Sequence, residues 1–264
     1  MKQKIVSILF IVLFSVSFLA AEDRPGPPFK ILYSNDFTNI KLPSPYKIPG
    51  PWNIKNLEGS IAETAEAGID VHMLQPAHTW VPWWQSDVYP MKEHYEWWFS
   101  RYGNYPKRDI HEYILKGGDP FRDYIDYCRK HNQSAFVSLR INDGHHLNHV
   151  NTEGNTRGNH AICKFFAENP QYRLGKSLTD RSQYVQDWIH EPVRNYKYRL
   201  IKEICENYDI DGLEIDYLRH WYFFKDSVSQ AKKERIMTGF IKKVRDVLDR
   251  TSKEDQHRWL CVRV

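Results

Sequence analysis

The segment Tyr208-Asp-Ile-Asp-Gly-Leu-Glu-Ile-Asp-Tyr-Leu-Arg-His220 carries the pattern that decides the fold of this chain. Leu213 and Ile215 project to one side of an extended segment, as alternate residues do in a β-strand. Glu214 and Asp216 then project to the other side. Because the apolar side chains need a covering layer of helices, we expect both carboxylates on the inner side of a sheet, with Asp216 at the carboxyl end of its strand.

Further β-rich runs alternate with helical patterns on both sides of this segment. The predicted strands are Lys30–Asn35, Ile69–Gln75, Ser134–Ile141, Ile210–Asp216 and Trp259–Val264. The predicted helices are Asn56–Ala67, a second that opens with Asp119 as N-cap and Pro120, a third that starts at Glu191-Pro192, and Ser227–Arg250. Strand and helix in alternation are typical of a parallel sheet with crossover helices.

A doubly wound sheet and a barrel both fit that alternation, and two features favour the barrel. No Gly-rich phosphate loop follows the first strand. The long insertions follow the second and third strands, as loops at the catalytic mouth of a barrel do. The predicted fold class is therefore α/β, a parallel (β/α)8 TIM-type barrel. Because only five strands are predicted, we expect a chain truncated after about five strands, with 22–264 as the N-terminal portion of the catalytic domain.

Residues 1–21 are predicted to form a secretory signal peptide. Lys2 and Lys4 precede an apolar run over 5–19, and two alanines then offer small residues at a cleavage point. The run of roughly 15 residues is short for a membrane span of about 20. We therefore expect a secreted or periplasmic protein without stable membrane insertion after cleavage, with an uncleaved anchor as the alternative.

Composition narrows the classes of function. The net charge of +4 is nearly balanced and no Lys/Arg run approaches a polybasic patch, so no nucleic-acid partner is expected. The sequence contains no Ser-nucleophile elbow, HExxH, paired CxxC or P-loop, and no cofactor is expected. The aromatic content of 14%, with nine Trp, indicates a surface built for stacking.

Cysteine chemistry is expected to be minor. Cys128 and Cys205 occupy apolar helix positions and Cys261 lies in a predicted strand, a pattern that indicates buried thiols. One disulfide that involves Cys163 stays open, because an oxidising compartment would permit it.

The predicted strand Ser134–Ile141 supplies a cation for the carboxylates. By alternation Arg140 and Asn142 face inward, as does Arg263 in the last strand. Arg140 beside Glu214 and Asp216 would form a charge-assisted network that keeps a carboxylate ionised. A purely structural interior ion pair fits the same geometry.

A carboxylate at the carboxyl end of a barrel strand can act as a nucleophile, as a base, or as an electrostatic stabiliser of an oxocarbenium ion. We interpret Asp216 as the leading catalytic carboxylate, with Glu214 and Arg140 as its catalytic partners. In the structural alternative, Glu214 pairs with an interior cation and fills the barrel.

The segment that follows the third strand is rich in polar rings. Asp143, His145, His146 and His149 include side chains that bind metal ions, but their spacing matches no strong metal motif. We therefore expect Asn142, Asp143, His145 and His146 to form hydrogen bonds with the substrate. A metal site and a solvated loop are the alternatives.

The insertion after the second strand is aromatic. Trp80, Trp83 and Trp84 flank Pro82 and are expected on a loop surface, where the apolar C–H faces of sugar rings would stack on them. Packing in the core is the alternative for each ring. Trp97 and Trp98 fit the core side of a short helix as well as a sugar platform.

Two segments carry a family resemblance. Trp188-Ile-His-Glu-Pro-Val-Arg-Asn-Tyr196 and Tyr208-Asp-Ile-Asp-Gly-Leu-Glu-Ile-Asp-Tyr217 resemble the glycosyl hydrolase-like, family-10-like barrel proteins of bacteria. The opening Ser34-Asn-Asp36 and the Arg140-containing strand are also similar, so the resemblance covers most of the mature chain. The chitinase version of the second motif has a Glu two residues after its last Asp, where this chain has Leu218, and this departure argues against a chitinase mechanism.

The resemblance implies a TIM-barrel fold and glycosidase activity, with Asp216 and Glu214 as the catalytic candidates. Asn35 and Arg219 lie within its motifs and, together with Arg263, are expected to bind substrate. The sequence thus predicts an exported glycoside hydrolase that acts on O-glycosidic bonds of a poly- or oligosaccharide through barrel-mouth carboxylates. A non-catalytic carbohydrate-binding barrel is the alternative, and a metal-dependent hydrolase is the third reading.

Overall fold

The computed structural model of the chain describes residues 27–76, 80–103, 107–175, 181–218, 220, 222–254 and 256–264. The predicted signal peptide at 1–21 lies outside this part of the chain, as does Arg219. None of the helices found in the described ranges combines the length and the apolar character that crossing a membrane requires.

The described chain is built on one five-stranded parallel sheet in the order β1-β2-β3-β4-β5. Its strands are β1 (Leu32–Asp36), β2 (Val71–Gln75), β3 (Ser134–Arg140), β4 (Gly212–Asp216) and β5 (Trp259–Arg263). The predicted α/β class and all five predicted strands are confirmed, although β1 ends one residue later than predicted. Within the described residues β1 and β5 are the two edges of the sheet, so closure into an eight-stranded barrel stays a prediction.

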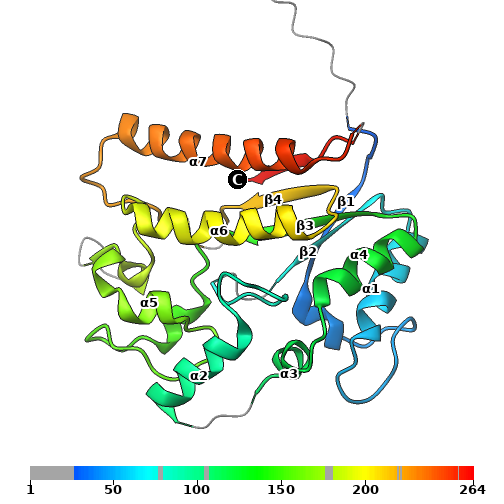
Figure 1. Cartoon of the computed structure of the whole chain (residues 1–264), viewed down its shortest axis with the longest axis horizontal. Coiled ribbons are helices and arrows are strands. Elements are labelled where there is room, and N and C mark those ends of the chain that lie inside the picture. Colours follow the sequence, from blue (N-terminus) through cyan, green and yellow to red (C-terminus); the bar gives the residue numbers. More distant parts are fainter. Residues whose placement is uncertain are drawn as a thin grey trace, which may run out of the picture.

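Four helices cover the outer face of the sheet, as the sequence predicts (Figure 1). They are α1 (Lys55–Glu66), α4 (Pro120–Lys130), α6 (Glu191–Asn207) and α7 (Gln230–Thr251). Leu213 and Ile215 of β4 are fully buried in the same apolar core as these helices. The predicted N-cap of α4 is confirmed, because the Asp119 carboxylate accepts a hydrogen bond from the backbone N–H of Phe121 at 3.1 Å.

The insertions after β2 and β3 contain short elements that lie away from the four covering helices (Figure 1). They are α2 (Met91–Tyr102), α3 (Asp109–Leu115), α5 (Lys164–Glu168), and the 3-10 turns η2 (His145–His149), η3 (Pro170–Tyr172) and η5 (Arg181–Tyr184). A further 3-10 turn, η1 (Phe37–Lys41), follows β1 directly. These segments pack on the carboxyl-end side of the sheet, where the candidate site lies.

The inner face of the sheet changes from apolar to charged along the strands. Near the amino ends, the ring of Phe136 contacts Phe29 edge-on at 5.5 Å between centroids, and Phe29 contacts Trp259 in the same way. Gly212 is required in this layer, because a Cβ there would lie 2.4 Å from the Phe136 ring. Toward the carboxyl ends the inward side chains are polar in two successive layers. Asp36 and Gln75 continue the layer of Ser138 and Glu214, and Arg140, Asp216 and Arg263 form the layer above it. We call Asp36, Gln75, Arg140, Asp216 and Arg263 together the mouth row.

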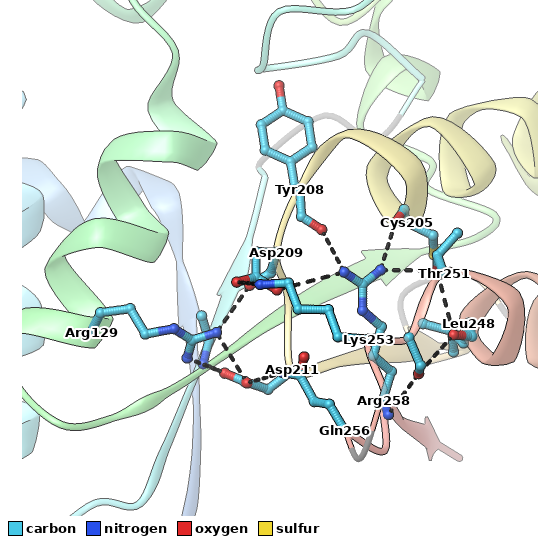
Figure 2. Close-up of polar contacts among 12 residues, drawn as sticks. Arg129, Cys205, Tyr208, Asp209, Asp211, Leu248, Thr251, Lys253, Gln256 and Arg258 are labelled. Atoms are coloured by element: carbon cyan, nitrogen blue, oxygen red, sulfur yellow. Dashed lines mark hydrogen bonds and ion pairs between the residues drawn. The ribbon is translucent and has the colours of Figure 1, made fainter.

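A polar network ties the loops together at the opposite, amino ends of the strands (Figure 2). The Arg129 guanidinium on α4 donates to the Asp209 carbonyl at 3.0 Å and forms an ion pair with Asp211, which directly precedes β4. The Asp211 carboxylate also accepts the backbone N–H of Ala135 at 2.7 Å. The network therefore fixes the start of β4 to α4 and β3.

Arg258 is the buried centre of the same network (Figure 2). Its guanidinium donates to the carbonyl oxygens of Cys205 at 2.6 Å and Tyr208 at 3.1 Å, and to the Thr251 hydroxyl at 2.9 Å. Two of these acceptors are at the carboxyl end of α6, where helix carbonyls have no partner within the helix. Arg258, which directly precedes β5, thus supplies the hydrogen-bond donors for the carbonyl oxygens at the end of α6.

All four cysteines are free thiols, and Cys128, Cys163 and Cys205 are buried. The prediction of buried thiols is confirmed for Cys128 and Cys205, whereas Cys261 is only partly buried. Cys163 is a free thiol, so the disulfide left open for it is not present.

Candidate active site

Asp216 ends β4 between two cations. In the sheet register Arg140 of β3 and Arg263 of β5 are its direct neighbours, so all three side chains emerge on the inner face at one level. Oδ1 of Asp216 accepts the backbone N–H of Leu218 at 2.8 Å. Oδ2 lies 3.8 Å from Arg140 Nε and 4.0 Å from Arg263 Nη1, and it accepts no hydrogen bond from the described residues. This oxygen is therefore held between positive charges with its hydrogen-bonding capacity unused.

Glu214 lies one layer below and is fully engaged. Its Oε1 accepts the Ser138 hydroxyl at 2.6 Å and lies 2.8 Å from Arg263 Nη2, while Oε2 lies 3.0 Å from the same nitrogen. A carboxylate with both oxygens bonded to buried or half-buried donors holds those donors in place. Glu214 therefore orients Arg263, and Asp216 is the carboxylate of β4 with an oxygen available for chemistry.

Asp36 brings a second carboxylate into contact with Arg140, and the sequence analysis missed it. Oδ1 caps η1 by accepting the Thr38 N–H at 3.0 Å, while Oδ2 accepts Arg140 Nη2 at 3.2 Å. Because one guanidinium contacts both carboxylates, the nearest oxygens of Asp36 and Asp216 are at most about 9 Å apart, close enough for both to act on one glycosidic bond.

Asn35, the predicted substrate ligand in β1, faces the other way, and this placement corrects the sequence analysis. Its carboxamide bonds to His72 Nε2 at 3.2 Å and accepts Asn39 Nδ2 at 2.9 Å, on the helix side of the sheet. The predicted strand ended at Asn35, one residue short. The extra residue of β1 is Asp36, which the alternation of the strand directs to the inner face.

The polar side chains of the segment after β3 mainly form hydrogen bonds to neighbouring loops. Asn142 donates Nδ2 to the carbonyls of Gln186 at 3.2 Å and Tyr222 at 2.7 Å, which ties the β3 loop to the β4 loop. A Cβ on Gly144 would lie 2.2 Å from His220, so these two loops touch. The Asp143 carboxylate accepts the His145 backbone N–H at 2.9 Å and pairs with its ring.

His146 is buried against Phe166 with 4.0 Å between ring centroids, and burial lowers the pKa of its imidazole to about 3. The ring is therefore neutral and enclosed by protein, and the substrate contact expected for His146 stays a prediction. His145 stays partly exposed. Within the described residues no group of three or more His, Cys, Asp or Glu side chains is placed to hold a metal ion.

The three tryptophans expected on a loop surface are in the core instead. Trp80, Trp83 and Trp84 are each at most 2% exposed. Trp80 Nε1 donates to the Asp143 carbonyl at 2.9 Å, and Trp84 Nε1 donates to the Glu203 carboxylate of α6 at 2.8 Å. The rings attach the insertion after β2 to its neighbours, and none offers a face to a sugar. A sequence of Trp and Pro does not distinguish the two outcomes, because both burial and stacking use the same apolar ring.

A hollow of about 510 Å³ lies beside the mouth, in the loop between β1 and α1. Lys41, Lys47, Trp52 and Asn56 are among its lining residues. No member of the mouth row lines it. The candidate site is therefore defined by the strand ends and their charges, and this hollow is a separate feature.

Lys197 is a buried cation behind the mouth that the sequence analysis did not single out. It lies on α6, is fully buried, and places Nζ 4.0 Å from the centre of the Trp80 ring. Burial lowers the pKa of Lys197 to about 7, against the opposing effect of the Asp143 and Cys163 charges. The signal in the sequence was its position in the apolar stripe of α6, between Val193 and Leu200.

We expect Lys197 to make the protein more stable as the pH rises. The unfolded chain holds this proton up to the ordinary pKa of 10.5, so between pH 7 and about 9.5 the unfolded state binds more protons than the folded state. Lys197 alone should therefore add about 3 kcal/mol to the free energy of unfolding over that interval, while the buried thiols of Cys128, Cys163 and Cys205, whose pKa values burial raises, act in the opposite direction. The difference in free energy of unfolding between the unsubstituted protein and Lys197→Met should accordingly grow by about 3 kcal/mol in favour of the unsubstituted protein.

Urea titrations at the two pH values measure this difference. Lys202, on the exposed side of the same helix, is paired with Glu206, and Lys202→Met is the matched control, which should change with pH as the unsubstituted protein does. A Lys197→Met protein that gains as much stability as the unsubstituted protein would show that this lysine is charged when folded.

Comparison with known proteins yields matches to solved structures alone. No family model matches the chain, and no curated protein matches it. The galactosidase domain of an alpha-galactosidase-sucrose kinase is similar at 13% identity over 80% of this chain and 25% of that one, with a TM-score of 0.45. The GH36 alpha-galactosidase AgaA of Geobacillus stearothermophilus is similar at 12% identity over 89% of this chain and 28% of that one, also with a TM-score of 0.45.

Alpha-L-fucosidase isoenzyme 2 of Paenibacillus thiaminolyticus is similar at 12% identity over 87% of this chain and 32% of that one, with a TM-score of 0.45. The chain thus spans between a quarter and a third of the length of these proteins. At this level of similarity the comparisons assign no residue a role, and the functional argument rests on the mouth row itself.

Proposed function

We propose that the protein is an exported glycoside hydrolase that cleaves O-glycosidic bonds of a poly- or oligosaccharide at the mouth row. One observation carries the proposal: Asp216 Oδ2 is held between two guanidinium groups, at 3.8 and 4.0 Å, and accepts no hydrogen bond from the described residues. Export through residues 1–21 and closure of the sheet into a (β/α)8 barrel are parts of the same proposal.

In this proposal Asp216 is the carboxylate that attacks or stabilises the anomeric carbon. Hydrolysis of a glycoside proceeds through an oxocarbenium-like transition state and uses two carboxyl groups on either side of the bond. Asp36 is the second carboxyl group, because Arg140 contacts both acids and fixes their separation. Arg140 and Arg263 are positioning residues, and Glu214 holds Arg263 in place. In this assignment the two carboxylates and the two guanidinium groups of the mouth row balance in charge, which suits a neutral substrate.

A binding protein for carbohydrate is the second candidate, and the engaged state of Glu214 favours it. If the whole row were a structural ion network, like the one between Glu214, Ser138 and Arg263, the mouth would bind sugar hydroxyls without cleaving a bond. The two candidates differ in one product, the reducing end released by hydrolysis.

The experiment pairs two measurements on the same samples. Affinity electrophoresis through gels that contain soluble starch, xylan, galactomannan or mixed-linkage β-glucan reports binding, and a reducing-end assay on the same polysaccharides reports cleavage. Release of reducing ends from at least one polysaccharide supports the hydrolase. Retardation in the gel without release supports the binding protein, and neither effect on any of them contradicts both.

A further inference from the structure

Gln75 is the one member of the mouth row that neither the sequence analysis nor the proposed mechanism uses. It ends β2 and pairs in register with Asp36. Val71 and Met73 of the same strand pack with Phe136 on the inner face, so the alternation of β2 directs Gln75 to that face as well. The carboxamide therefore lies in the candidate site, beside the second carboxylate.

The Gln75 carboxamide is buried without a hydrogen-bond partner. The residue is 2% exposed, and among the described residues neither Oε1 nor Nε2 has a hydrogen-bond partner. Buried amides in folded proteins are nearly always bonded, because an unbonded amide loses its bonds to water without replacement. A molecule that both donates and accepts hydrogen bonds would satisfy this group, which has no partner among the described residues. Water and a sugar hydroxyl share that chemistry.

We propose that Gln75 binds one hydroxyl group of the sugar that occupies the mouth row, and that it exchanges a bound water for that hydroxyl when the substrate enters. The carboxamide then accepts from the hydroxyl through Oε1 and donates to it through Nε2. Its neighbour Asp36 contacts the same sugar in this proposal. Gln75 therefore determines which face of the sugar ring is presented to Asp36 and Asp216. This inference rests on the proposed carbohydrate site but does not require that the site be catalytic.

A second buried glutamine provides a matched control. Gln133 precedes β3 and is 3% exposed, but it donates Nε2 to the Ile69 carbonyl at 2.8 Å on the helix side of the sheet. The two side chains are therefore equally buried, but only the Gln133 carboxamide is hydrogen-bonded within the described residues. Gln75→Met should leave the melting temperature unchanged or higher, since an unbonded amide is replaced by an apolar group of similar length. Gln133→Met should lower it.

The test measures sugar binding as a ligand-induced shift of melting temperature with glucose, galactose, mannose, xylose and L-fucose, and then with deoxy analogues of the sugar that binds best. Gln75→Met should weaken binding of that sugar at least 10-fold, and Gln133→Met should leave it unchanged. One deoxy analogue should bind the unsubstituted protein at least 10-fold more weakly than the parent sugar does. Gln75→Met should bind that analogue and the parent sugar equally.

The inference is overturned if Gln75→Met and the unsubstituted protein bind the sugar with equal affinity. It is also overturned if Gln75→Met loses affinity for every deoxy analogue by the same factor. In the first case Gln75 binds only structural water. Because binding is measured without turnover, a protein that binds sugar but releases no reducing ends removes the hydrolase and leaves this inference standing. If none of these sugars binds, the inference fails together with the carbohydrate site.

Discussion

Asp216→Asn is expected to lower kcat on any polysaccharide that the protein cleaves by about 1000-fold or more, with little change in KM. The asparagine keeps the length of the side chain and can still accept the Leu218 N–H through Oδ1. It replaces the oxygen between Arg140 and Arg263 by a neutral NH₂ group, which cannot attack or stabilise a cationic anomeric centre. Initial rates of reducing-end release over a range of substrate concentrations measure both constants.

Glu214→Gln is the control variant, because it changes the other carboxylate of β4 in the same way. The amide oxygen can still accept from Ser138 or Arg263, so the variant should lose roughly 10-fold in kcat through a looser Arg263. Melting temperatures of both variants report whether the fold is retained. Hydrolysis by Asp216→Asn at the rate of the unsubstituted protein contradicts the assignment of Asp216. If kcat falls further in Glu214→Gln than in Asp216→Asn, the roles of the two carboxylates are reversed.

Arg258→Met should lower the free energy of unfolding by about 3–5 kcal/mol without altering sugar binding. The substitution removes the donors of the Cys205 and Tyr208 carbonyls at the end of α6 and leaves those oxygens buried without partners. It also removes the hydrogen bond that joins the start of β5 to Thr251 at the end of α7 (Figure 2). Urea unfolding followed by circular dichroism gives the difference.

Lys253→Met is the matched control for Arg258, since Lys253 belongs to the same network but is largely exposed. Its ammonium contacts the Asp209 carboxylate at 2.6 Å, and exposed pairs of this kind contribute about 1 kcal/mol or less. A loss of stability as large in Lys253→Met as in Arg258→Met would mean that burial of the guanidinium adds nothing. The network would then be a surface feature rather than the connection between α6 and β5.

The alternation in β4 made half of the site predictable. Leu213 and Ile215 had to face helices, so the positions of Glu214 and Asp216 followed, and the same parity placed Arg140 and Arg263 beside them. The helices that cover the sheet were equally readable from their spacing and from the Asp119 cap.

The other half depended on strand ends and tertiary contacts that local patterns do not encode. Ending β1 one residue early selected Asn35 in place of Asp36, since a shift of one residue exchanges the faces of a strand. Gln75 carries no charge to mark it, and it stands out only because its buried amide has no partner among the residues that the structure describes. The Trp80 insertion misled for a different reason, because burial of an aromatic ring is decided by the loops that fold over it.

A crystal structure of the protein with its best-binding sugar would test the central claim most directly. The account predicts density for a sugar ring over the carboxyl ends of the strands, with Asp36 and Asp216 on either side of the anomeric carbon and one hydroxyl bonded to Gln75. A sugar in the hollow between β1 and α1, with the mouth row empty, would contradict the account.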